Sequence, residues 1–119
     1  MTTPFNISRD RWSLREIIMD EGDRAGRGGF ALVLDDEHFP YFRYPQSRVL
    51  ADALNQAADG AEAPPVALGE GTPVQVRPTP QAVLVLSPAG ATRALSIGEA
   101  KLLARDLLNP LAQTLTGQD

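Results

Sequence analysis

Two stretches of this sequence show the same succession of hydrophobic and polar positions. In residues 30–58 and again in residues 83–112, a dense apolar run is followed by a polar turn, a second extended run and a segment with helical spacing. The apolar runs Phe30–Leu34 and Val83–Leu86 contain no polar position, which is typical of strands buried on both faces. The pattern therefore predicts two matching halves, each built from strands and one helix.

The segment Trp12–Met19 fits two interpretations. Ser13 and Glu16 have the spacing of a helix capping box, and the apolar positions around them suit a helix. However, a glycine-rich stretch at residues 22–29 separates this segment from the next strand, as in a long-looped hairpin. The matching segment of the second half, residues 74–77, alternates as a strand does. We favour a strand, because it gives both halves the order β-β-β-α.

Start and stop signals mark both predicted helices. Ser47 stands where its hydroxyl can accept the free amides of the first helix. Ser96 and Glu99 form the capping-box pattern for the second helix. Pro110 predicts a kink in that helix or its end near Leu108, because the proline ring clashes with the preceding turn.

The length of 119 residues predicts a single domain. Within 1–119 we expect a loose N-terminal arm at 1–7, a first half at 12–58, a linker at 59–73 and a second half at 74–116. The expected fold class is α+β, with an antiparallel sheet, two helices on one face, and pseudo-duplicated β-β-β-α halves. Two helices leave the other face of one common sheet uncovered, which favours a homodimer.

Composition excludes several classes of protein. There is no cysteine, so disulfides, thiolate nucleophiles and sulfur-ligated metals are excluded. No segment resembles a signal peptide or a membrane-spanning helix, so we expect a cytoplasmic protein without membrane contact. The net charge of −4 provides no general attraction to phosphate. Lys101 is the only lysine beside ten arginines, and this bias together with many alanines suggests a GC-rich bacterial genome.

The acidic turn Asp35–His38 contains the only histidine, beside three carboxylates. Such groups suit Mg²⁺ or Mn²⁺, or a general base. Adjacent residues of one turn point in different directions, however, so a solvated hairpin turn is the favoured interpretation. Because no nucleophile motif accompanies the histidine, we expect a non-enzymatic protein with no catalytic residue, no metal and no cofactor.

Two segments contain candidate binding residues. The segment Phe39–Tyr44 is aromatic, and on a regular strand Phe39, Tyr41 and Arg43 would share one face. The glycine-rich tip at 22–29 carries two arginines suited to phosphate or an acidic partner. The predicted binding residues are therefore Arg24, Arg27, Tyr41 and Arg43.

These residues support two functions. The first is a non-catalytic bacterial protein that binds another protein and acts as a homodimer. The second is a single-stranded DNA or RNA binder, in which Tyr41 stacks on bases and the arginines contact phosphates. In element order, residues 92–96 running into a helix at 98–108 resemble the half-repeats of the PUR and Whirly single-stranded nucleic-acid binders. The second half lacks the basic, aromatic strand faces of those families.

Overall fold

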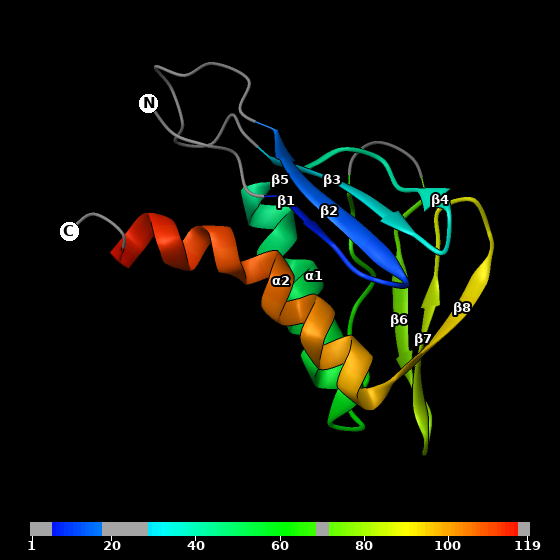
Figure 1. The fold of residues 1–119 in the computed structure, drawn as a ribbon. Coiled ribbons are helices and arrows are strands. Elements are labelled where there is room, and N and C mark those ends of the chain that lie inside the picture. The colour runs from blue at the N-terminus through cyan, green and yellow to red at the C-terminus, as the bar shows by residue number, and fades with distance from the viewer. Residues whose placement is uncertain (1–5, 18–28, 69–71, 117–119) are drawn as a thin grey trace.

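The computed structural model describes residues 6–17, 29–68 and 72–116, with side chains up to residue 108, and it has an α+β fold. All strand pairs are antiparallel, and the two helices lie together on the same side of the strands (Figure 1). The elements, in chain order, are β1 (Asn6–Ser8), β2 (Trp12–Ile17), β3 (Gly29–Leu34), β4 (Glu37–His38), β5 (Phe42–Arg43), α1 (Tyr44–Ala58), β6 (Gln75–Pro78), β7 (Ala82–Leu86), β8 (Thr92–Ser96) and α2 (Ile97–Thr116).

The described strands form two sheets, whereas we expected one common sheet. The first sheet has the order β1-β2-β3-β4, with β5 also paired to β3, and the second has the order β6-β7-β8. At the edge of β8, the backbone carbonyl of Ala94 accepts a hydrogen bond from Arg11 (2.8 Å). A side chain thus occupies an edge position that a neighbouring strand would otherwise take. Both halves run through strands into a helix, but their duplication stays a prediction.

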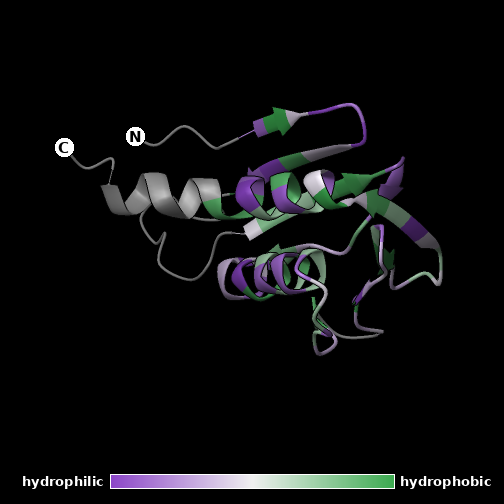
Figure 2. Ribbon diagram, turned by 90° about the horizontal axis from the view of Figure 1, so that it is seen from below, coloured by the Kyte–Doolittle hydropathy of each residue, from purple (hydrophilic) through white to green (hydrophobic). Residues whose placement is uncertain are grey.

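The helices are antiparallel to each other. Near the start of α1, the Ser47 hydroxyl donates to the carbonyl oxygen of Leu107 in α2 (2.9 Å). At the other end, Lys101 of α2 lies 3.5 Å from Asp59, which follows α1. Hydrophilic and hydrophobic residues are interspersed along α1 and along the coloured part of α2 (Figure 2). Their buried apolar residues, which pack in the core with both sheets, are Leu50, Ala51, Ala53, Leu54, Ala57, Ala58, Ala100, Leu103, Ala104 and Leu107.

Each sheet turns one face towards the helices. In β3 the buried side chains are Phe30, Leu32 and Leu34, and in β7 they are Val83 and Val85. We name the opposite side of the two sheets the outer face. On it the residues between these positions are only half-buried, so the expectation that both faces would be fully buried is wrong for this chain alone. The half-buried residues of the outer face in β3 and β7 are Ala31, Val33, Ala82, Leu84 and Leu86.

The strand interpretation of Trp12–Met19 is confirmed for Trp12–Ile17, and the last two residues lie outside the described part. Asn6 and Ile7 pair with β2, so they belong to a strand and not to a loose arm. Within the segment 59–73, Val66 and Leu68 are buried, and Val66 forms a two-way backbone bridge with Val74. The described residues around Val66 are therefore fixed to the start of the second sheet.

Helix α1 begins at Tyr44, three residues before the predicted cap at Ser47. Pro45 suits this earlier start, because the first turn of a helix needs no backbone N–H donor. The capping box of α2 is confirmed, with Ser96 and Glu99 exchanging hydrogen bonds of 2.9 and 3.0 Å. Helix α2 does not end near Leu108 but continues past Pro110. No helix of the described residues is long and apolar enough to cross a membrane.

Candidate functional site

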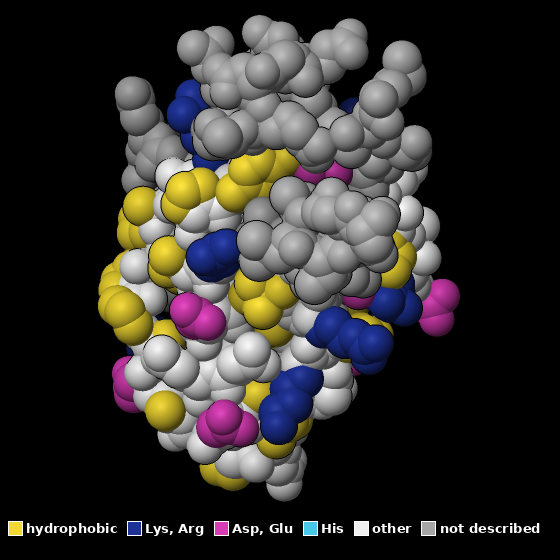
Figure 3. Space-filling model, turned by 90° about the vertical axis from the view of Figure 1, so that its left-hand side faces the viewer, with side chains coloured by type: hydrophobic (Ala, Val, Ile, Leu, Met, Phe, Trp, Pro, Cys, Tyr) yellow, Lys and Arg dark blue, Asp and Glu magenta, His cyan; other side chains and the backbone are white. Residues whose placement is uncertain are grey.

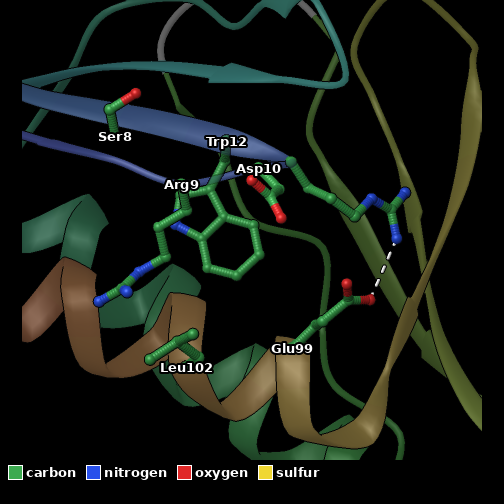
Figure 4. A pocket seen from close by; sticks show the side chains of 7 residues that line it. Ser8, Arg9, Asp10, Trp12, Glu99 and Leu102 are labelled. Atoms are coloured by element: carbon green, nitrogen blue, oxygen red, sulfur yellow. Dashed lines mark hydrogen bonds and ion pairs between the residues drawn. The ribbon is translucent and has the colours of Figure 1, made fainter.

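A pocket of about 380 Å³ opens between the β1–β2 turn and the first turns of α2. Glu99 and Leu102 project from α2 towards the turn, and the side chains of Arg9, Asp10 and Trp12 lie opposite them (Figure 4). The pocket therefore combines an apolar wall with charged groups of both signs. Its lining residues are Ser8, Arg9, Asp10, Arg11, Trp12, Glu99 and Leu102.

Behind the pocket, a buried carboxylate fixes the β1–β2 turn onto α2. The Asp106 side chain is 1% exposed and accepts two hydrogen bonds from the Arg9 guanidinium, at 2.7 and 2.8 Å. The indole N–H of Trp12 donates a third, at 3.0 Å. The hydrogen bonds and negative charge of Asp106 raise the pKa of Arg9 above its usual value. A buried charge needs such partners, and here they come from the opposite end of the chain.

Arg11, which also lines the pocket, connects three parts of the fold. Its guanidinium pairs with Asp35 at 2.5 Å and with Glu99 at 3.1 Å, and it also donates to the carbonyl oxygen of Ala94. The hydrogen bonds from Arg11, and then the charges of Arg11 and Arg93, lower the pKa of Asp35. Asp35 and Glu99 raise the pKa of Arg11, with the hydrogen bond to Asp35 as the main cause.

A second arginine completes this network. Arg93 of β8 donates two hydrogen bonds to Glu37, at 3.0 and 2.8 Å, and lies 3.7 Å from Asp35. The pKa of Glu37 is lowered first by a hydrogen bond from Ser87 and then by Arg93. This network joins the β1–β2 turn, the β3–β4 turn, β8 and α2. We name it the junction cluster, and it consists of Arg11, Asp35, Glu37, Arg93 and Glu99.

The acidic turn is a tight hairpin, as expected, but its carboxylates are not simply solvated. Asp35 and Asp36 have φ values of 50° and 66°, and Leu34 pairs with Glu37 across them. Two successive left-handed residues are typical of a two-residue hairpin turn, in which aspartate is tolerated. Both Asp35 and Glu37 form ion pairs in the junction cluster. Among the described residues, no group of three or more His, Cys, Asp or Glu side chains is arranged to hold a metal ion.

Comparisons with protein-family models, with curated proteins and with solved structures found no match. The function is therefore argued from the surface and the pocket of this chain. On the side of the molecule in Figure 3, hydrophobic, acidic and basic side chains are interspersed, and the described residues show no large patch of one charge there.

Of the four predicted binding residues, Tyr41 and Arg43 are described and both are exposed, Tyr41 by 37%. Arg24 and Arg27 lie outside the described residues. The expected common face of Phe39, Tyr41 and Arg43 is wrong, because Phe39 is buried.

The register explains this difference. Phe30 pairs with Phe42 and Val33 pairs with His38, so the strand that includes β4 and β5 holds one residue more than β3 between these pairs. Such a bulge reverses the alternation of side chains. The backbone N–H of Arg43 then donates to Gln46 at the start of α1 (2.8 Å).

The pocket and the junction cluster were not found from the sequence. Their residues are far apart along the chain: Arg9 and Asp106 are 97 positions apart, and Arg11 and Glu99 are 88 positions apart. One local signal was available: Asp106 is next to Leu107 in the apolar stripe of α2 and three residues after Leu103. An acidic residue at such a position needs a basic or N–H partner when the helix packs.

Proposed function

We propose that this chain is a non-catalytic protein of the bacterial cytoplasm that works by binding another protein, as a homodimer. The observation that carries the proposal is the outer face, where Val33, Leu84 and Leu86 remain half-buried and no described helix covers them. Aliphatic side chains on the outer face of the two sheets gain free energy when a partner removes them from water. The junction cluster supports a structural role for the charged groups, because its charges are paired with one another inside the chain.

The size of the outer face limits how such a dimer can form. Three strands about 4.8 Å apart and five residues long, at about 3.3 Å each, cover about 240 Å². A stable interface removes about 800 Å² of accessible surface from each partner. The proposed interface therefore extends over the outer face of both sheets. Arg43 pairs with Gly29, which has the same orientation in β3 as Ala31 two residues later, so Arg43 belongs to the outer face of the first sheet.

Size-exclusion chromatography with light scattering tests the homodimer. We expect twice the chain mass of 12.8 kDa for the natural sequence and a single chain mass for Leu84→Lys, with an unchanged circular dichroism spectrum. Val49→Lys is the matched control, because Val49 is 47% exposed on α1, away from the outer face. A natural protein that elutes as a monomer at every concentration refutes the dimer.

The protein partner is proposed to contact Arg24, Arg27, Tyr41 and Arg43. The exposure of Tyr41 and Arg43 supports this proposal, and tyrosine and arginine are enriched at interfaces. Tyr41→Ala should weaken capture of the partner without changing the dimer mass. Arg43→Ala should weaken capture as well, but because Arg43 lies on the outer face, this variant should also weaken the dimer.

The exposure of Tyr41 beside Arg43 also favours a second candidate, a single-stranded nucleic-acid binder. Stacking of a base on an aromatic ring contributes about 1–3 kcal/mol, and contacts to phosphates make binding depend on salt. At low salt a single-stranded oligonucleotide should then bind, and Tyr41→Ala should weaken it by at least about fivefold. If the natural protein gives no shift of the oligonucleotide, this second candidate is wrong.

A further inference from the structure

We infer that the pocket at the β1–β2 turn accepts a basic side chain, lysine or arginine, of the bound protein partner. This inference rests on the proposed function, because it assigns a chemistry to the partner. The volume of about 380 Å³ is at the low end of the range for ligand sites. It suits one long side chain, with Leu102 and the small exposed part of Trp12 (4%) beside the apolar stem.

The charges around the pocket favour a cation. The two arginines that line it are already neutralised, Arg9 by Asp106 and Arg11 by Asp35. Asp10 is exposed and has no partner among the described residues, and the Glu99 side chain is 36% exposed although it shares Arg11. The pocket therefore has an excess of negative charge at its rim, over an apolar wall.

The bonding of the arginines also argues against an anion. Arg11 donates to both oxygens of Asp35, to Glu99 and to the carbonyl oxygen of Ala94, which uses four of the five N–H groups of a guanidinium. Arg9 directs two of its N–H groups to the buried carboxylate of Asp106. An anion at Arg11 would have to compete with Asp35 and Glu99, whereas an ammonium or guanidinium group adds to Asp10 and Glu99 without breaking a bond.

The pocket lies apart from the surface proposed for the homodimer. Its residues come from the β1–β2 turn and α2, whereas the outer face belongs to the sides of the sheets turned away from the helices. A dimer of this chain can therefore still present its pockets to a partner. A partner that carries a lysine or arginine next to an apolar residue would place the charge at the rim and the stem against Leu102.

Nuclear magnetic resonance on the full chain tests the inference. The probes are Nα-acetyl-lysine methylamide, the uncharged norleucine analogue of the same length, and inorganic phosphate. The indole N–H of Trp12 reports on the pocket, because Trp12 is the only tryptophan. We expect saturable shifts of this signal and of the turn amides with the lysine probe, and none with the norleucine probe.

Two double variants decide whether the effect is local. Asp10→Asn with Glu99→Gln keeps a capping acceptor at position 99. This double variant should weaken binding of the lysine probe about fivefold to tenfold, as expected for the loss of two exposed carboxylates. Asp52→Asn with Glu62→Gln changes the net charge equally at exposed positions elsewhere and should have no such effect.

Equal responses to lysine and norleucine, equal weakening by both double variants, or a response to phosphate alone overturns the inference. Light scattering separates this result from the proposed homodimer. A dimer that does not respond to the lysine probe refutes the pocket assignment alone, and a monomer that binds the probe refutes the dimer alone.

Discussion

Replacing Asp106 by asparagine tests how strongly the buried carboxylate holds the β1–β2 turn on α2. The substitution keeps the size of the side chain and removes its charge. The carboxylate is 1% exposed and accepts three hydrogen bonds, of which two converge on Oδ2 and one ends on Oδ1. An asparagine has one acceptor oxygen, so its amide N–H₂ must face a donor of Arg9 or of Trp12.

The structure gives the size of the expected effect. A hydrogen bond to a charged group contributes about 1.5–3 kcal/mol, and a neutral one about 0.5–1.5 kcal/mol. Losing one charged bond and weakening the remaining bonds predicts a loss of about 2–4 kcal/mol in the free energy of unfolding of Asp106→Asn. For a chain of this length, such a loss lowers Tm by roughly 10 °C.

Urea unfolding followed by circular dichroism measures this free energy, and the emission of Trp12 reports on the site itself. Asp10→Asn makes the same chemical change on the exposed side of the same turn and should stay within about 0.5 kcal/mol of the natural protein. If Asp106→Asn costs no more than Asp10→Asn, the hydrogen bonds of the buried carboxylate do not stabilise the fold, and our reasoning is refuted.

Three further predictions concern the rest of the fold. The pKa values of Asp35 and Glu37 are lowered by folding, so the stabilisation they provide is complete at neutral pH and is lost as the pH falls through their folded pKa values. Urea midpoints measured from pH 7 down to about pH 3 should show this loss of stability. The double variant Asp35→Asn with Glu37→Gln should show a smaller loss over the same pH range. Gly29→Ala would place a methyl group against the backbone of β5 and should lower the free energy of unfolding by about 1–3 kcal/mol. Gly98→Ala has open space in the first turn of α2 and should raise the free energy of unfolding by about 0.5–1 kcal/mol. Thermal melting measures both changes. Ser47→Ala should cost about 1 kcal/mol in urea unfolding, and an unchanged midpoint would show that its bond to α2 is not stabilising.

The parts of the fold that depend on short-range patterns were predicted from the sequence. The apolar runs mark β3 and β7, and the Ser96–Glu99 pair marks the start of α2. These signals lie within a few residues, where periodicity and capping act directly. The α+β class with antiparallel strands and two helices follows from them.

Tertiary contacts explain where the sequence prediction was wrong. Helix α1 starts at Tyr44, whose hydroxyl donates to the buried Glu16 at 2.6 Å and whose ring packs edge-on against Phe30. These contacts involve strands that are distant in the sequence, so the local capping pattern around Ser47 does not reveal them. Ser47 lies inside α1, where its hydroxyl donates to the carbonyl oxygen of Leu107 in α2. The neighbouring carbonyl of Asp106 has no helical donor, because Pro110, four residues later, has no backbone N–H.

The candidate site was the least predictable part, because it assembles from distant segments. Asp35 and Arg11 are 24 positions apart, and Arg93 and Glu37 are 56 apart, so no spacing rule relates them. Tyr41 and Arg43 were predicted as exposed contacts, and their exposure agrees, but the bulge that buries Phe39 is set by the pairing with β3. Register of this kind depends on the whole sheet and not on the local alternation.

The tie between Arg9 and Asp106 has a consequence for synthesis of the chain. The two residues stand 97 positions apart, so the amino-terminal hairpin leaves the ribosome long before the carboxylate that fixes it has been translated. Contacts of such long separation form late and slow the folding of small domains. Until α2 has been synthesised, Arg9 and Trp12 therefore lack the carboxylate that accepts their hydrogen bonds in the folded chain.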